Sequence, residues 1–244
     1  RMNQQAEAEA WFRRTIVLRP SAVEARNELA LTLAAQGKTN EATAQFQEVL
    51  RIRPSFAEAH VNWGLMLANS GAHSAAREHY QAALAINPRS VAARMNLAKL
   101  LLSQKDLDGA IEQYREAIKI RPGEVAAHLS LASAYQDASL LKEAQAEFET
   151  ALQLDPNSAL AHLNLGVLLA NSNNRSEARA HFQAAADNDP TLAEAEFYLG
   201  MTYLQDGRLS DGAAHLEKAL AINPQHVMAR AYLDRLRASQ QPRN

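Results

Sequence analysis

The chain has 244 residues, 47% of them hydrophobic and 6% aromatic, and its 25 Lys/Arg against 27 Asp/Glu give a net charge near −2. This balance lacks the positive field of a nucleic-acid-binding domain, so nucleic acid is not an expected partner. The absence of cysteine excludes disulfides, thiolate metal sites and cysteine nucleophiles, and it suits cytoplasm and periplasm equally. No apolar run reaches the ~20 residues that a membrane-spanning helix requires.

Proline recurs every 34 residues through the chain, at Pro20, Pro54, Pro88, Pro122, Pro156, Pro190 and Pro224. A constant period of this length is typical of stacked helical repeats. We number each repeat so that its proline occupies position 32. The sequence then predicts a partial repeat at 1–22 with a second helix only, six complete repeats at 23–56, 57–90, 91–124, 125–158, 159–192 and 193–226, a capping helix at 227–239, and a disordered tail at 240–244.

Each complete repeat carries two apolar stripes. The first combines bulky residues at positions 7 and 11 with a small residue at position 8; the second combines small residues at positions 20 and 27 with a ring or leucine at position 24. Spacings of three and four residues place each stripe on one face of a helix, here called helix A and helix B. The side chain at position 24 needs the space that small residues leave. The remaining apolar faces then pack on neighbouring repeats.

Turn-forming residues separate the two helices. Gly37, Gly71, Gly207 and Asn173 occupy position 15, where we expect left-handed backbone at the end of helix A. We expect caps for helix B from position 18, which holds Asn40, Ser74, Asp108, Ser176 and Ser210. We expect caps for helix A from the hydroxyl residues after the proline, which are Ser21, Ser55, Ser90, Ser158 and Thr191.

These small residues at positions 8, 20 and 27, bulky residues at 7, 11 and 24, and proline at 32 resemble the tetratricopeptide repeat over nearly the whole chain. The resemblance implies an all-α right-handed superhelix of about 14 helices whose helices A line a concave surface. Position 4 departs from the family pattern, in which it is often aromatic. It holds Arg26, His60, Arg94, His128, His162 and Glu196.

Catalytic motifs are absent from the sequence. It contains no glycine-rich phosphate loop, no Gly-x-Ser-x-Gly elbow and no His-Glu-x-x-His helix, so we expect neither enzymatic activity nor a cofactor. Histidine recurs at positions 4 and 23, as His60, His128, His162, His79, His181 and His215. Packed helices lie ~8 to 10 Å apart, whereas zinc-bound histidines bring a nitrogen within ~2.1 Å of the metal. We therefore interpret these histidines as structural and expect no metal.

The face of helix A opposite its core stripe is the candidate binding surface. Its members are Asn62, Asn69, Asn96, Lys99, Ser130, Asn164, Asn171 and Tyr198, with Leu65, Met95, Leu129, Leu163, Phe197 and Met201 beside them. An amide both donates and accepts, so it can pair with a peptide backbone whatever the side chains. The asparagines at position 6 resemble the ladder of protein O-GlcNAc transferase repeats, which implies that they hold the backbone of a bound segment.

The sequence thus predicts a non-catalytic scaffold that binds an extended or helical segment of another protein in its concave groove. A receptor for acidic chain ends is not expected, because Lys99 is the only basic residue on this face. Two alternatives stay open: a substrate-recruiting arm of a larger enzyme such as a glycosyltransferase, and a subunit that self-associates end to end through its exposed first helix. We expect the chain to begin inside a longer protein. Its 19 Arg against 6 Lys are typical of a GC-rich, most often bacterial, genome.

Overall fold

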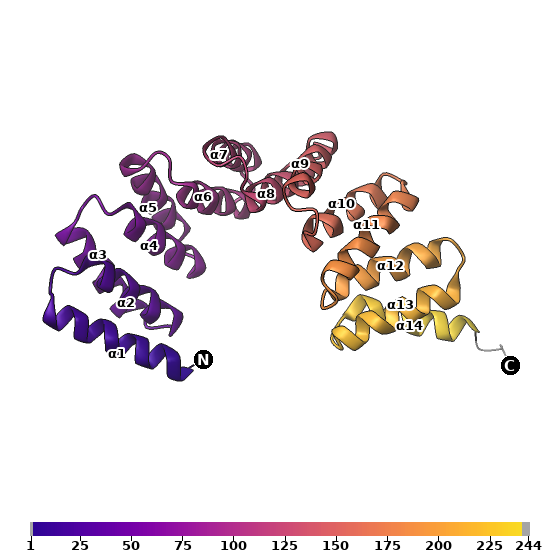
Figure 1. Ribbon diagram of the computed structural model, residues 1–244, viewed down its shortest axis with the longest axis horizontal. Helices are drawn as coiled ribbons and strands as arrows, with labels where there is room; N and C mark the ends of the chain where they lie inside the picture. The colour runs from indigo at the N-terminus through magenta and orange to yellow at the C-terminus, as the bar shows by residue number, and fades with distance from the viewer. Residues whose placement is uncertain (1, 241–244) are drawn as a thin grey trace. The chain divides into compact units, whose positions relative to one another are not determined.

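The computed structural model describes residues 2–240, which form fourteen α-helices and no strand (Figure 1). The predicted all-α class is confirmed. The helices are α1 (Met2–Leu18), α2 (Val23–Ala35), α3 (Thr39–Ile52), α4 (Ala57–Asn69), α5 (His73–Ile86), α6 (Val91–Ser103), α7 (Leu107–Ile120), α8 (Val125–Asp137), α9 (Leu141–Leu154), α10 (Ala159–Asn171), α11 (Arg175–Asn188), α12 (Ala193–Gln205), α13 (Leu209–Ile222) and α14 (Val227–Gln240).

The chain divides into two compact units, residues 1–122 and 123–244, here called unit 1 and unit 2. Unit 1 holds α1 to α7 and unit 2 holds α8 to α14. Within each unit, helix A lies beside helix B of its own repeat and successive repeats stack (Figure 1). None of the described helices is long and apolar enough to cross a membrane.

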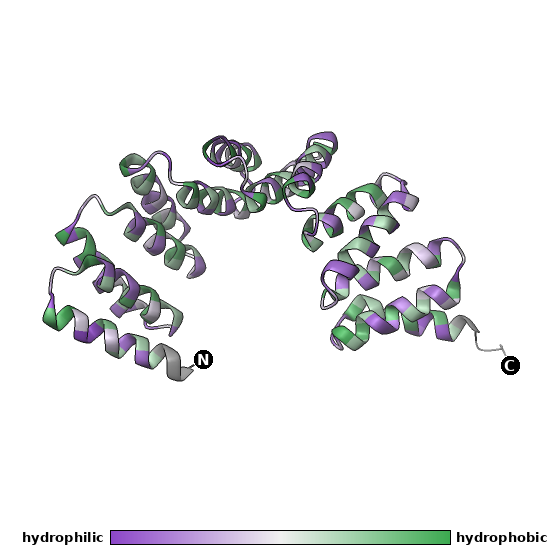
Figure 2. Cartoon of the chain, viewed as in Figure 1, coloured by the Kyte–Doolittle hydropathy of each residue, from purple (hydrophilic) through white to green (hydrophobic). Residues whose placement is uncertain are grey.

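The core follows the alternation of large and small residues. The position 24 side chains Phe46, Tyr80, Tyr114, Phe148, Phe182 and Leu216 are buried, as are the small residues at position 20. In repeats 2 and 5 the ring packs closely on the glycine at position 8 of its own repeat: a Cβ added at Gly64 would lie 2.7 Å from Tyr80, and one at Gly166 would lie 2.6 Å from Phe182. Figure 2 shows the resulting mixture of hydrophobic and hydrophilic residues along every helix.

Left-handed backbone ends helix A in every complete repeat. The predicted positions have φ of 75° at Gly37, 81° at Gly71, 76° at Gly207 and 62° at Asn173. The other two repeats adopt the same conformation without glycine, at Lys105 (φ 63°) and Ser139 (φ 60°). The position is therefore set by the turn that two packed helices require, and glycine relieves its strain in only three repeats.

The predicted helix caps are partly wrong. Helix B begins at position 17, so the residues at position 18 lie inside the first turn and the cap falls at position 16, where Asp106 accepts a hydrogen bond from the Gly109 N–H at 3.0 Å. For helix A the cap is position 34. Ser90 and Ser158 occupy it and accept from Ala93 and Ala161. Ser21, Ser55 and Thr191 precede the cap by one residue, and Ala22, Phe56 and Leu192 give no side-chain cap.

The two outermost helices differ in polarity. On α1, Phe12 and Ile16 pack partly against the core of unit 1, while Trp11 is 63% exposed. The helix α14 has exposed Asp234 and Arg237, and Arg237 Nη2 donates to Glu217 at 2.9 Å. This helix continues to Gln240, one residue beyond the predicted capping helix. Of the tail predicted at 240–244, Gln240 therefore belongs to this helix, and 241–244 lie outside the described residues.

Candidate peptide-binding surface

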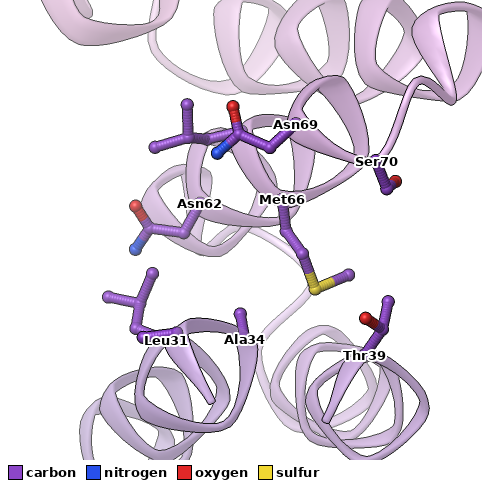
Figure 3. Close-up of a pocket in the computed structure, with 9 residues that line it drawn as sticks. Leu31, Ala34, Thr39, Asn62, Met66, Asn69 and Ser70 are labelled. Atoms are coloured by element: carbon purple, nitrogen blue, oxygen red, sulfur yellow. The ribbon is translucent and has the colours of Figure 1, made fainter. Parts of the chain in front are cut away.

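An open groove of about 360 Å³ lies between α2 and α4 in unit 1 (Figure 3). Apolar and amide side chains line it together: Leu31, Ala34 and Ala35 from α2, Thr39 from α3, and Asn62, Leu65, Met66 and Asn69 with the following Ser70 on the α4 side. Figure 3 shows Met66 reaching toward Ala34 and Thr39, with Asn62 opposite Leu31. The structure thus brings together three residues that the sequence analysis selected, Asn62, Leu65 and Asn69.

Sequence reasoning missed part of this lining. Leu31 occupies position 9, the same position as Leu65, so applying the positional rule to the first repeat would have found it. Ala34 at position 12 and Met66 at position 10 gave no such signal, because they lie between the core stripe and the expected binding face. The groove needs the small side chain of Ala34 to leave space between two neighbouring helices A.

A buried amide orients Asn62. Asn62 Nδ2 donates to Asn27 Oδ1 at 3.2 Å, and Asn27 Nδ2 donates in turn to Glu28 Oε1 at 3.4 Å. Asn27 is only 1% exposed and occupies position 5, which is apolar in all five other complete repeats. With its amide nitrogen engaged, Asn62 offers the acceptor Oδ1 to a ligand. The amide of Asn27, at a position that is otherwise apolar, was the signal in the sequence for this hydrogen bond.

The remaining candidates of unit 1 lie on α6, outside the groove. Met95 and Asn96 are partly buried and Lys99 is exposed. Within residues 2–240, the side chains of Asn69 and Asn96 make no hydrogen bond, so both amides are available to a ligand.

The candidates of unit 2 are covered to different degrees. Leu129, Ser130 and Asn164 are partly buried and Asn171 is exposed, while Met201 packs at the edge of a core cluster. Leu163 and Phe197 are 8% and 9% exposed, so they offer little surface, contrary to the expectation from position 5. The ring of Tyr198 stacks on Phe182, with centroids 5.1 Å apart and planes at 13°. Position 5 packs toward the neighbouring repeat, which explains this burial.

A hydrogen-bonded pair joins position 4 of helix A to position 23 of helix B in all six complete repeats; we call each pair a rung. In unit 1 the rungs are Arg26–Gln45 at 3.1 Å, His60–His79 at 2.9 Å and Arg94–Gln113 at 3.0 Å. In unit 2 they are His128–Glu147 at 2.6 Å, His162–His181 at 2.9 Å and Glu196–His215 at 2.6 Å.

The rungs correct the argument from helix spacing. Side chains from positions 4 and 23 reach across the space between the helix axes, so the distance between axes does not keep the histidines apart. His60 contacts His79, and His162 contacts His181. Among the described residues, no group of three or more metal-ligating side chains is found.

In several repeats, the residue at position 4 also bonds to the end of the preceding repeat. Arg26, Arg94 and Arg230 donate to the carbonyl oxygens of Pro20, Pro88 and Pro224 at 3.0 to 3.1 Å. His162 Nε2 lies 3.1 Å from the Pro156 carbonyl oxygen and makes the same contact. In these repeats a hydrogen-bond donor at position 4 therefore satisfies an orphan carbonyl at the end of the preceding helix B, a task that a phenylalanine cannot perform.

Burial changes the proton affinity of the histidine rungs. Removal from water lowers the pKa of His60, and it lowers the pKa of His79 to about 4 with a further contribution from His60. Burial and the neighbouring His162 also lower the pKa of His181, whereas Glu177 and Glu149 act in the opposite direction. The imidazoles of His60, His79 and His181 are thus neutral at pH 7.

Solved structures with the same fold include pilF of Pseudomonas aeruginosa, which is 21% identical over 89% of this chain and 99% of its own, with a TM-score of 0.75. A chain of the APC/C hetero-tetramer Cut9–Hcn1 is 18% identical over 95% of this chain and 46% of its own, with a TM-score of 0.73. YrrB, described as a TPR protein with an unusual peptide-binding site, is 21% identical over 77% of this chain and 96% of its own, with a TM-score of 0.59.

Identities at this level show the fold alone. No curated protein matches the sequence. The family model of the tetratricopeptide repeat matches residues 1–55, 27–91, 61–125, 129–193 and 171–227, so the chain belongs to the tetratricopeptide repeat family.

Proposed function

We propose that this protein-interaction scaffold binds an extended segment of a partner protein along its helices A, with the groove between α2 and α4 as the principal contact. The observation that carries the proposal is the groove itself. Its apolar floor and the oriented amide of Asn62 face one space, which is the combination that fixes a peptide by backbone and side chain together.

The groove chemistry defines the bound segment. Leu31, Leu65 and Met66 form an apolar hollow that suits an aliphatic side chain, whose burial contributes about 1.5 to 3 kcal/mol. Asn62 Oδ1 accepts a backbone N–H of the segment, for about 1 kcal/mol net. The amides of Asn69 and Asn96 extend the contact along the chain. The peptide-binding description of YrrB, a protein of the same fold, supports this assignment.

The test selects peptides on the whole chain from a displayed library and measures their affinities by calorimetry. We expect Leu65→Asp to weaken a selected peptide at least about tenfold, because it places a charge in the apolar hollow. Leu65 is 39% exposed, so the fold tolerates the change. Asn62→Ala removes one hydrogen bond and is expected to weaken binding about fivefold.

The matched control is Leu141→Asp, which changes an exposed leucine on α9, far in sequence from the groove. It is expected to bind like the parent chain. Unchanged affinity in Leu65→Asp, with its helical circular dichroism intact, contradicts the groove assignment. A role as the recruiting arm of a larger enzyme would use this same groove.

A second candidate is self-association through α1, on which Trp11, Val17 and Leu18 are exposed. A hollow of about 340 Å³ between α1 and α2 adjoins Trp11 and Phe12. The polar Asp234 and Arg237 on α14 do not complement that surface, which weighs against end-to-end association. Sedimentation over a range of concentrations tests it: association that Trp11→Glu abolishes supports this candidate, and a constant monomer mass contradicts it.

A further inference from the structure

The rung of repeat 2 is built from two neutral imidazoles. His60 Nδ1 on α4 and His79 Nδ1 on α5 are 2.9 Å apart. A bond between two Nδ1 atoms needs one proton between them, so one imidazole donates and the other accepts. A first added proton goes to the free Nε2 of the donor ring and leaves the bond intact. A second proton, on the accepting Nδ1, puts two N–H groups face to face and breaks it.

Little around this rung compensates the added charge. The ring of Trp63 lies against His79, with centroids 4.2 Å apart. Among the described residues, His60 is the titratable group whose charge affects the pKa of His79. The equivalent rung residues on the packed helices α2 and α6 are Arg26 and Arg94, which are cations held by glutamines and proline carbonyls. No carboxylate among the described residues offsets protonation of His79.

We propose that the His60–His79 rung is an acid-operated latch that holds α4 to α5 while both rings are neutral and releases them when both rings are protonated. The pKa of His79, lowered to about 4 by burial, fits a latch that stays closed at neutral pH. Release acts on the groove, because Asn62, Leu65, Met66 and Asn69 lie on α4. This consequence for ligand affinity rests on the proposed function.

Rungs of other repeats in the same chain provide two control variants. His60→Arg with His79→Gln copies the rungs of repeats 1 and 3 and removes the titrating pair. His79→Glu alone copies the His128–Glu147 rung of repeat 4, in which a carboxylate faces the imidazole, and a carboxylate beside His60 favours the protonated form of that ring.

The experiment follows the fluorescence of Trp63. The sequence has two tryptophans, and the Trp11→Phe substitution removes the other one. Emission and Tm are recorded for the whole chain between pH 7.5 and pH 4, because an imidazolium against the indole face changes its emission. We expect the parent to show an emission transition below pH 6.5 with a fall in Tm of several degrees. The Arg/Gln variant is expected to lose the transition and fall less, and His79→Glu to fall least.

Equal pH profiles in the parent and the Arg/Gln variant overturn the latch. If the double substitution unfolds at pH 7.5, His79→Glu decides alone: a profile identical to the parent again overturns it. The link to the groove is read separately from peptide affinity at pH 7.5 and at pH 4, where His79 takes up its proton. A Trp63 transition with unchanged affinity keeps the latch and refutes its effect on the groove, whereas absence of any selected peptide refutes the proposed function only.

Discussion

Units 1 and 2 share one backbone plan but use different polar chemistry between helices A and B. The outer rungs of unit 1 pair arginine with glutamine, whereas the outer rungs of unit 2 pair histidine with glutamate, once in each order. The middle rung is His–His in both units. Positions 4 and 23 therefore vary together: what the repeat requires is a donor facing an acceptor, and no particular residue.

The units also differ at the helix A face. Unit 1 has amides at positions 5 and 6, in Asn27 and Asn62, beside an open groove. The last repeat of unit 2 has rings at the same positions, and these are turned inward: Phe197 is buried and Tyr198 stacks on Phe182. At position 6, exchanging the amide for a ring replaces a side chain that lines the groove with one that stacks on its neighbour.

Breaking a histidine–glutamate rung of unit 2 is expected to give the largest effect. Glu196 and His215 have only 14% and 16% of their side-chain surface exposed, and Lys218 lies 3.7 Å from the same carboxylate. Glu196→Ala removes the shared acceptor and leaves His215 without its partner. We expect a loss of about 3 kcal/mol in the free energy of unfolding at pH 6, measured by urea denaturation.

The matched change in unit 1 is Gln113→Ala. It is expected to cost about 1 kcal/mol, because Arg94 keeps its bond to the Pro88 carbonyl. Equal losses in the two variants contradict the distinction between rungs with a carboxylate acceptor and rungs with an amide acceptor.

The next effect concerns position 8, where unit 1 and unit 2 each contain both alanine and glycine. Gly166→Ala places a Cβ 2.6 Å from the ring of the buried Phe182. We expect a destabilisation of about 2 kcal/mol from this overpacking, although alanine is the ordinary residue here in repeats 1, 3 and 4. Thermal unfolding followed by circular dichroism measures it.

The control is Ala98→Gly, the reverse exchange at position 8 of unit 1. It leaves the Tyr114 ring in place and costs about 1 kcal/mol through helix propensity and lost packing. A neutral Gly166→Ala shows that the Phe182 ring can move aside, and it contradicts the packing argument.

The fold was predictable because the signals that determine it are periodic. The chain repeats the 34-residue proline interval and the small and large residues at positions 8, 20 and 24. A departure from the pattern in one repeat therefore does not change the predicted fold. Cap positions were less predictable, since a shift of one residue separates the capping Ser90 from the non-capping Ser55.

The candidate site was predictable only in part, because it depends on contacts across helices. A periodic count places Asn62, Leu65 and Asn69 on one face, and the structure brings them into one groove. The same count cannot show that Phe197 is covered by its neighbours. The rungs were not predicted because the two residues of each pair are 19 positions apart in the sequence. The sequence argument also used the distance between helix axes, which ignores the length of the side chains.

The two His–His rungs are expected to titrate differently. Among the described residues of unit 1, burial and His60 lower the pKa of His79 and no carboxylate opposes them, whereas in unit 2 Glu177 and Glu149 favour the protonated form of His181. Side-chain NMR is expected to show His79 titrating near pH 4 and a smaller lowering of the pKa of His181, because the two glutamates favour its protonated form. Coincident midpoints contradict the role of the two glutamates.

The sign of the stability change follows from these pKa values. Because the folded pKa values of His60, His79 and His181 are lowered, the unfolded chain binds more protons, and stability falls as pH drops from about 6.5 toward 4. For His79 we expect a loss of about 1 to 2 kcal/mol after discounting its partial exposure. Urea denaturation at several pH values measures it, and stability that rises on acidification excludes it.

The smallest expected effect tests whether the helix A faces of the two units are interchangeable. Tyr198→Asn gives unit 2 the amide that Asn62, Asn96 and Asn164 carry at position 6. It removes the stack on Phe182 and is expected to cost about 1 kcal/mol. The new amide should face outward, since the space beside Phe182 is apolar. Amide hydrogen exchange on α11 and α12 distinguishes the outcomes: slightly faster exchange confined to these helices is expected, and global loss of protection indicates that Tyr198 is an essential part of the core.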